Sequence, residues 1–185
     1  MKELSLNILD ITENSVKAGA TLIKILILES EELLKITIED NGSGMTQEVL
    51  QSVENPFYTT RTTRKVGMGI PLFRFAAEQT NGSFAITSRH VDTYPDNHGT
   101  VVCAEFNKGH IDFTPLGDVI STLTTLIQGH PDIDFLFTHE YGNLEVGLDT
   151  REIRAVLEDV PLNTFEVIAW IKDTLTEQYD SFWQK

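Results

Sequence analysis

The stretch of sequence that decides the fold reads Asp40-Asn41-Gly42-Ser43-Gly44-Met45. It follows an apolar run over 33–39 that alternates with polar residues, which predicts a strand. Gly42 and Gly44 then allow a tight turn whose backbone can approach a ligand closely. An aspartate at the end of a strand beside such a turn is a good acceptor for an exocyclic amino group. An Asp-x-Gly-x-Gly sequence alone is more often an ordinary turn, so the neighbouring patterns must decide between the two.

A polar stripe on a predicted helix lies upstream of this turn. Helical periodicity covers 4–18, and Gly19 stands where the helix would end. Spacings of four and seven residues place Asp10, Asn14 and Lys17 on one face. An amide oxygen can bind a hard cation, an ammonium group can neutralise phosphate, and a carboxylate can orient a water. The alternative is the solvated face of an amphipathic helix, which the helix taken alone favours.

A basic loop that runs into a second glycine turn lies downstream. Residues 55–72 read NPFYTTRTTRKVGMGIPL, and a helical pattern follows over 71–80. Backbone amides at the start of a helix suit an anion, because the positive end of the helix adds its field. A surface loop that happens to be basic is the alternative, but it is less expected in a chain with a net charge of −14.

Taken in this order, the three segments resemble the GHKL superfamily of ATP-binding domains, which includes histidine kinases, gyrase, the heat-shock chaperone of that group and the mismatch-repair ATPases. The resemblance covers roughly 4–107 and implies that ATP and Mg²⁺ are the cofactors. Asn14 matches the family's magnesium-binding asparagine, and Asp40 matches the aspartate that accepts from the adenine amino group. The other positions implied in nucleotide binding are Lys17, Gly42, Gly44, Met45, Phe57, Arg64, Lys65, Gly67, Gly69 and Thr100.

The fold that the resemblance implies is a two-layer α/β sandwich. In it a mixed sheet carries helices on one face, and ATP binds between the sheet, the helices and a mobile lid at about 54–68. The local patterns agree with this fold. They predict strands at 22–28, 33–39, 84–88 and 100–106 and helices at 4–18, 46–53 and 71–80.

Asp10 is the candidate catalytic residue. The hydrolysing branch of the superfamily has a glutamate as general base four residues before the magnesium asparagine, and this chain has the shorter Asp10 there. A general base must lie within hydrogen-bond reach of the proton that it removes, and the side chain of Asp10 is one methylene shorter than that of glutamate. Fast ATP hydrolysis is therefore not expected. Lys17 resembles the histidine-kinase version, in which it contacts phosphate. The neighbouring carboxylate, Glu13, is expected to lie on the surface, because helical geometry rotates it away from Asn14.

A phospho-acceptor histidine on a dimerising helical hairpin is not expected in this sequence, so autophosphorylation in cis is not expected either. The predicted helix with Asn14 begins close to the start of the chain. None of the five histidines lies in a helical acceptor pattern, and none has the spacing of a structural metal site. They are His90, His98, His110, His130 and His139.

Composition restricts the class of protein further. No apolar run is long enough to cross a membrane, no signal segment opens the chain, and the single Cys103 falls in a predicted strand, so a cytoplasmic protein is expected. Residues 1–105 carry 9 basic and 14 acidic side chains, and 106–185 carry 5 and 14. This balance argues against nucleic acid as a partner, because nucleic-acid binding needs a basic surface.

A domain boundary is predicted near residue 107, with an ATP-binding domain at 1–107 and a small acidic α+β extension at 108–185. The extension matches no part of the GHKL fold and is expected to pack on the first domain. Its patterns predict a helix at 115–128 opened by Thr114 and Pro115, strands at 133–139 and 144–148, and helices at 150–158 and 164–179. Its acidity and its aromatic residues suit binding of a protein partner, although filling of its own core is the favoured alternative for the aromatics, which are Trp170, Phe182 and Trp183.

The whole chain is also similar to stand-alone histidine-kinase-like ATP-binding proteins of anaerobic bacteria, whose genes tend to lie beside iron-hydrogenase genes. The function expected from these observations is an ATP- and magnesium-dependent regulatory protein in signal transduction. It would phosphorylate or switch a protein partner, as an anti-sigma-like factor or a trans-acting kinase. A slow ATPase with Asp10 as base and a non-catalytic, nucleotide-dependent binding module remain as alternatives.

Overall fold

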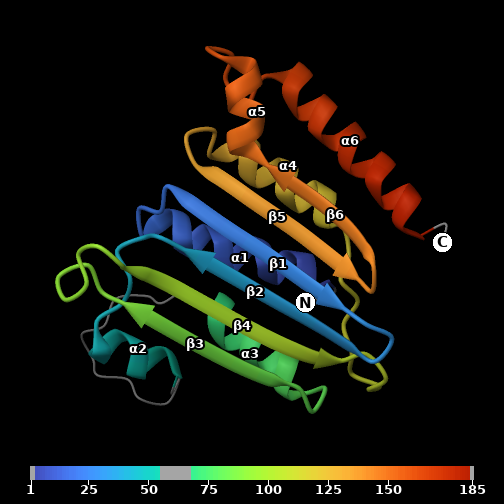
Figure 1. Ribbon diagram of the computed structural model, residues 1–185. Coiled ribbons are helices and arrows are strands. Elements are labelled where there is room, and N and C mark those ends of the chain that lie inside the picture. The colour runs from blue at the N-terminus through green and yellow to red at the C-terminus, as the bar shows by residue number, and fades with distance from the viewer. Residues whose placement is uncertain (1–2, 55–67, 184–185) are drawn as a thin grey trace.

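A single six-stranded sheet organises the residues that the computed structural model describes, 3–54 and 68–183 (Figure 1). The strand order is β3-β4-β2-β1-β5-β6, and only the β1–β5 pair is parallel. The sheet is therefore mixed, as the family resemblance implies. Its strands are β1 (Leu22–Glu29), β2 (Leu33–Asp40), β3 (Ser83–Arg89), β4 (Gly99–Asn107), β5 (Asp134–Tyr141) and β6 (Leu144–Asp149).

Helices cover one face of this sheet and one of its edges. Helices α1, α3 and α4 lie behind the sheet in Figure 1, and α5 and α6 lie at the β6 edge. This arrangement is the predicted two-layer α/β sandwich. The helices are α1 (Leu4–Lys17), α2 (Gln47–Glu54), α3 (Gly69–Glu78), α4 (Val119–Gly129), α5 (Thr150–Leu157) and α6 (Phe165–Trp183).

The core forms where alternate strand residues face the helices. Ile25 lies opposite Ile38 of β2, and Ile27 lies opposite Ile36, and all four side chains are buried. The same row continues into β5, where Phe137 pairs with Ile25. Each such side chain contributes about 1.5–3 kcal/mol on burial, so this alternation fixes which face of the sheet carries the helices.

The segment after residue 107 contributes to the same sheet. Strand β5 pairs with β1 along its length, from Leu22 opposite Asp134 to Glu29 opposite Tyr141. Helix α4 also packs against α1. The division into 1–107 and 108–185 remains a prediction about domains. The structure adds that the second segment packs on the first by extending its sheet.

Helix α4 begins later than the predicted range of 115–128, so the prediction of its start was wrong. Asp118 is the N-cap, and its carboxylate accepts from the backbone N–H of Ser121 at 2.8 Å and from its hydroxyl at 2.6 Å. The hydrogen bonds of Ser121 lower the pKa of Asp118. The carbonyl of Pro115 instead accepts from the backbone N–H of Leu4 at 2.9 Å. Aspartate is among the strongest N-caps, so the helix begins after Asp118. The segment before Asp118 contacts α1 instead of extending α4.

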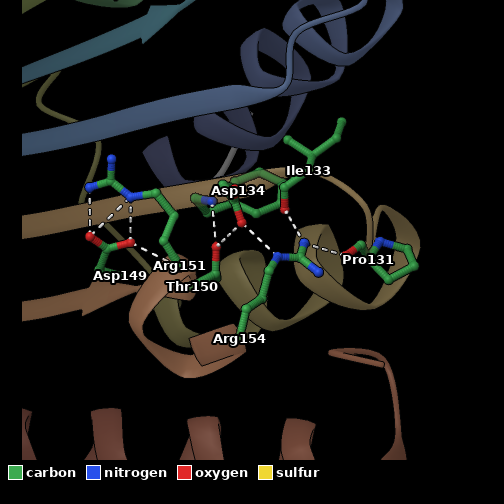
Figure 2. A network of polar contacts seen from close by, with 8 residues as sticks. Pro131, Ile133, Asp134, Asp149, Thr150, Arg151 and Arg154 are labelled. Carbon is green, nitrogen blue, oxygen red and sulfur yellow. Dashed lines mark hydrogen bonds and ion pairs between the residues drawn. The ribbon is translucent and has the colours of Figure 1, made fainter. Parts of the chain in front are cut away.

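A network of charged side chains fixes α5 to the start of β5 (Figure 2). Nε of Arg154 donates to Oδ1 of Asp134 at 2.7 Å, and Nη2 donates to the carbonyl of Ile133 at 3.1 Å. One turn earlier, the Arg151 guanidinium donates to both carboxylate oxygens of Asp149, with Nη2 at 2.6 Å from Oδ2. Two of the few basic side chains in this acidic segment are therefore neutralised within the protein.

A buried histidine joins α6 to the far end of the sheet. The side chain of His139 has no exposed area, and its Nε2 lies 2.9 Å from Oε2 of Glu29. Its Nδ1 lies 2.9 Å from the hydroxyl of Tyr179 on α6. Burial, and secondly the charge of Glu29, raises the pKa of Tyr179, so that its hydroxyl stays protonated. Lys108 donates to the other oxygen of Glu29 at 2.6 Å, so this carboxylate has partners on two sides.

The stability of the protein is expected to depend on pH through Glu29. Burial by itself raises the pKa of this carboxyl, but hydrogen bonds from His139 and Lys108, with their charges, outweigh it and hold the pKa below 4.5. A lowered pKa stabilises the fold above the pKa of the unfolded chain, and this contribution is lost as pH falls through the folded value. At pH 7 Glu29→Gln should lower the free energy of unfolding by about 1–2 kcal/mol.

Urea denaturation of the wild type and Glu29→Gln over a pH series measures how the free energy of unfolding of each depends on pH. The difference between the two should narrow as the pH falls below about 4.5. Glu39→Gln is the matched control, because its ion pair with Lys24 is half-exposed and should contribute little at any pH. A difference for Glu29→Gln that stays constant across the series would contradict the prediction.

Candidate functional site

Three polar side chains occupy one row at one end of the helix-covered sheet face. Asp40 is the last residue of β2 and lies opposite Thr100 of β4, which in turn lies opposite Ser88 of β3. Their positions continue the alternation that buries Ile38 and Val102 two residues away. The register of the strands therefore directs Asp40 toward the helices and away from the open face of the sheet.

A cavity of about 180 Å³ lies beside this row, between α1, the end of β2 and α3. Most of its walls are apolar, and one carboxylate reaches it, a combination typical of small-molecule sites. Five of the residues proposed from the sequence meet here: Asn14, Asp40, Gly44, Met45 and Thr100. The remaining lining residues are Ile11, Ser15, Ala18, Ile70 and Val102.

The Asp40 carboxylate is held in one orientation by two hydrogen bonds. The hydroxyl of Ser15 donates to Oδ2 at 2.6 Å, and the backbone N–H of Gly42 donates to Oδ1 at 2.9 Å. An ionised carboxylate has about four acceptor positions, so both oxygens can still accept from a ligand. Sequence reasoning missed Ser15. The available signal was its place four residues after Ile11, on the apolar side of the helix.

The turn after Asp40 is held by side chains from β3 and from the loop between β3 and β4. The backbone N–H of Met45 donates to Oγ of Ser88 at 2.7 Å. Nδ1 of His98 lies 2.5 Å from the carbonyl of Gly42 and therefore donates to it. Ser88 and His98 were not proposed from the sequence, because neither lies near Asp40 along the chain. Their contact with the turn depends on the β3–β4 hairpin.

The polar stripe on α1 separates into a residue in the cavity and two outside it. Asn14 is half-buried and lines the cavity, whereas Asp10 and Lys17 are exposed and do not. The start of α3 lies against this stripe. A Cβ on Gly69 would lie 3.0 Å from Cβ of Asp10 and 3.8 Å from Nδ2 of Asn14. Asp10, Asn14 and the first turn of α3 are therefore neighbours.

Glu13 is turned away from Asn14, as expected, and is partly exposed, but it has a partner within the protein. It is half-buried, and its Oε1 lies 2.7 Å from Nε2 of His130 at the end of α4. A residue next to Asn14 along a helix is turned by about 100°, which directs Glu13 toward α4. The pair joins two helices of the covering layer.

The remaining proposed residues lie outside the described part of the chain. They are Phe57, Arg64, Lys65 and Gly67, and the predicted lid at 54–68 falls largely in the same gap. Within 3–54 and 68–183, no group of three or more His, Cys, Asp or Glu side chains could hold a metal ion. A magnesium ion at Asn14 would therefore need ligand and water oxygens as further partners, which is how magnesium is commonly bound.

Residues 2–110 match the family model described as histidine kinase-, DNA gyrase B- and HSP90-like ATPase. The match covers more than half of the chain, and the chain belongs to this family. Its fold and the position of Asp40 at the strand end agree with the resemblance seen in the sequence.

Relatives within the family include both repair proteins and kinases. The DNA mismatch repair protein MutL of Listeria monocytogenes is 28% identical over 184 residues, which cover 80% of this chain and 30% of that protein. Sporulation kinase A of Bacillus subtilis is 29% identical over 108 residues, which cover 58% of this chain and 16% of that protein. The chain thus spans less than a third of the length of these relatives.

A solved structure with a similar fold is the Aquifex aeolicus MutL ATPase domain complexed with ADP. The TM-score is 0.54 and the identity 15%, and the likeness covers 85% of this chain and 70% of that one. An alignment over 85% of the chain cannot end at residue 107. The structural likeness therefore continues beyond residue 107, whereas the match to the family model ends at residue 110.

No helix in the described part of the chain combines the length and the hydropathy needed to span a membrane.

The turn after Asp40 requires glycine at position 44, which predicts a large effect of Gly44→Ala. The φ angle of Gly44 is +67°, and a Cβ there would lie 2.0 Å from the carbonyl oxygen of Arg89. Positive φ costs a non-glycine residue about 1–2 kcal/mol, and the overlap with backbone adds about 1–3 kcal/mol. Gly142→Ala is the matched control, with a φ of +61° and nothing within 4 Å. In urea denaturation Gly44→Ala should be less stable than Gly142→Ala, and equal stabilities would contradict this geometry.

Proposed function

We propose that this protein binds ATP with magnesium at the Asp40 cavity and acts as a nucleotide-dependent regulatory protein that phosphorylates or switches a protein partner. The observation that carries the proposal is the Asp40 carboxylate, held by Ser15 and Gly42 with acceptor positions left over. The description of the family to which the chain belongs names ATPases, and a solved structure of similar fold is complexed with ADP.

The cavity offers what an adenine base requires. Its exocyclic amino group is a donor, and Asp40 is an acceptor whose direction is already fixed. The apolar side chains of Met45, Ile70 and Val102 would contact the faces and edges of the ring. Thr100 adds a hydroxyl on the same row as Asp40. The polar contact gives specificity, while the apolar contacts supply much of the affinity.

The phosphates would lie toward Asn14 and the start of α3. The N-cap residue of this helix, Met68, provides no side-chain hydrogen bond to the first turn. The backbone N–H groups in the first turn of α3 are therefore not capped by that side chain and suit an anion, which the helix dipole also favours. Asn14 would supply one oxygen to the magnesium ion that accompanies the phosphates. Lys17, Arg64 and Lys65 keep the phosphate-binding roles that the family resemblance implies.

Asp10 is the proposed catalytic residue of this site. Asp10 and Asn14 are one helical turn apart, and both lie next to the start of α3. An exposed aspartate there could hold a water near the terminal phosphate, but its reach is shorter than that of a glutamate. A slow ATPase and a non-catalytic binding module are the alternatives. Relatives that carry kinase names support transfer to a partner protein.

The partner is proposed to be a protein, reached through residues 108–185, and the compartment to be the cytoplasm. The net charge of −14 supports this choice over nucleic acid, although several relatives are named DNA mismatch repair proteins.

Asp40→Asn should weaken ATP binding about 10- to 100-fold. Loss of a hydrogen bond to a charged acceptor costs about 1.5–3 kcal/mol. The amide N–H group of the introduced asparagine would also face the amino group of adenine, and both groups are donors. Isothermal titration calorimetry with magnesium-ATP measures the change. Asp112→Asn is a control with the same loss of charge at an exposed loop. If Asp40→Asn folds normally and binds as tightly as the wild type, the adenine assignment is wrong.

Asp10→Asn should abolish any slow release of phosphate and change ATP affinity by less than about twofold, because a base acts in the reaction step and not in binding. Phosphate release from γ-labelled ATP measures the rate. Label that appears on a co-purified protein would support the kinase, and label only in free phosphate would support the ATPase. An unchanged rate in Asp10→Asn would exclude Asp10 as the base.

A further inference from the structure

An open apolar groove of about 640 Å³ lies between α5 and α6 at the β6 edge of the sheet. Two strands, β1 and β5, separate this edge from the strand that ends at Asp40. The floor of the groove is formed by nearly buried side chains, among them Leu148, Ile153 and Val167. The groove is thus distinct from the Asp40 cavity and belongs to the segment proposed to bind a partner.

Large apolar side chains line this groove without being covered. Trp170 is 53% exposed, and Val156 is 83% exposed. Phe182, from the same helix as Trp170, is only 3% exposed and contributes to the core. Filling of the protein's own core therefore accounts for Phe182 but not for Trp170. An exposed tryptophan beside apolar helix residues is typical of a surface that another protein covers.

Addition of a strand at the groove is disfavoured, because the outer edge of β6 is occupied at Gly147. The side-chain amide of Gln178 accepts from the backbone N–H of Gly147 at 2.8 Å and donates to its carbonyl at 3.2 Å. Both outward main-chain groups of that residue are thus satisfied. What remains is a trough between two helices, which is the geometry that receives the apolar face of an amphipathic helix.

The charges around the groove select a basic partner. Glu152 and Glu166 line it, and neither forms an ion pair within the described residues. Two arginines of the same segment are engaged elsewhere, Arg151 with Asp149 and Arg154 with Asp134, as Figure 2 shows, and Lys172 of α6 does not line the groove. The acids of the groove therefore keep a net negative potential that lysine or arginine would complement.

We propose that this groove binds a basic amphipathic helix of a partner protein. The apolar face of the helix contacts Trp170 and Val156, and its lysine or arginine side chains pair with Glu152 and Glu166. This inference deepens the proposed partner-switching function and rests on it only for the existence of a protein partner.

Two synthetic helical peptides of about 18 residues test the proposal. Both carry the same leucine face, and the polar face is lysine in one and glutamate in the other. Fluorescence anisotropy of the labelled peptides, without nucleotide, should show binding of the lysine peptide and little binding of the glutamate peptide. Trp170→Ala should weaken the binding of the lysine peptide about tenfold or more.

A charge exchange separates local recognition from the overall charge of the protein. Glu152→Lys/Glu166→Lys should weaken the lysine peptide about tenfold and strengthen the glutamate peptide. Glu31→Lys/Glu32→Lys changes the net charge equally at the exposed β1–β2 turn and should have a smaller effect. Equal effects of the two double variants, or no binding of the lysine peptide, would overturn the proposal.

Self-association must also be measured, because a second copy of this chain could cover the groove. Light scattering of the wild type over a range of concentrations should show a monomer, or a dimer that Trp170→Ala leaves intact. A dimer that Trp170→Ala abolishes would mean that a second copy covers the groove, and would overturn the partner assignment. The peptide measurements contain no nucleotide, so they do not depend on the Asp40 site. Failure of ATP binding would reject the proposed nucleotide function and leave the groove result intact.

Discussion

The rest of the structure depends on the register of β1 against β2. In this register Ile25 faces Ile38 and Ile27 faces Ile36, and burial of these side chains under the helices makes any other register costly. A shift of β2 by one residue would place Asp40 on the open face of the sheet, where neither Ser15 nor the cavity could meet it. The position of the Asp40 carboxylate is therefore a consequence of apolar packing along the strand that ends with it.

The same covered face carries polar groups at its two ends and apolar groups between them. At one end lie Asp40, Thr100 and Ser88, and at the other lie Glu29 and His139. Every polar side chain of the second group has a partner within the protein, so that group serves to hold α6 in place. The Asp40 carboxylate keeps acceptor positions beside a cavity, and this difference makes it the candidate for binding a ligand, whereas the Glu29 group is a structural network.

The C-terminal segment adds both stability and a second surface. Strand β5 covers the edge of β1, and β6 with α6 in turn closes the new edge through Gln178. The segment is thus built into the sheet that carries the Asp40 site. Because the groove between α5 and α6 lies at an edge of this same sheet, the proposed nucleotide site and the proposed partner site are joined by contiguous packing.

The sequence by itself indicated the strands at 22–28 and 33–39, because short apolar runs rich in isoleucine, the second of them alternating with polar residues, are typical of strands. It also determined that an aspartate and a glycine turn follow a strand, and that Asn14 lies on a helix upstream. These local patterns were enough to place the chain in its family.

Only the tertiary structure decided which groups meet across long distances in the sequence. Three contacts join segments that lie far apart along the chain: the hydrogen bond from Ser15 to Asp40, the pair of Glu13 with His130, and the parallel pairing of β5 with β1. Local periodicity shows which side of an element is apolar but not which element will cover it. The start of α4 illustrates the same limit, because contact between Pro115 and α1 leaves the cap to Asp118. The residue types in the site were readable from the sequence, whereas their partners depend on packing.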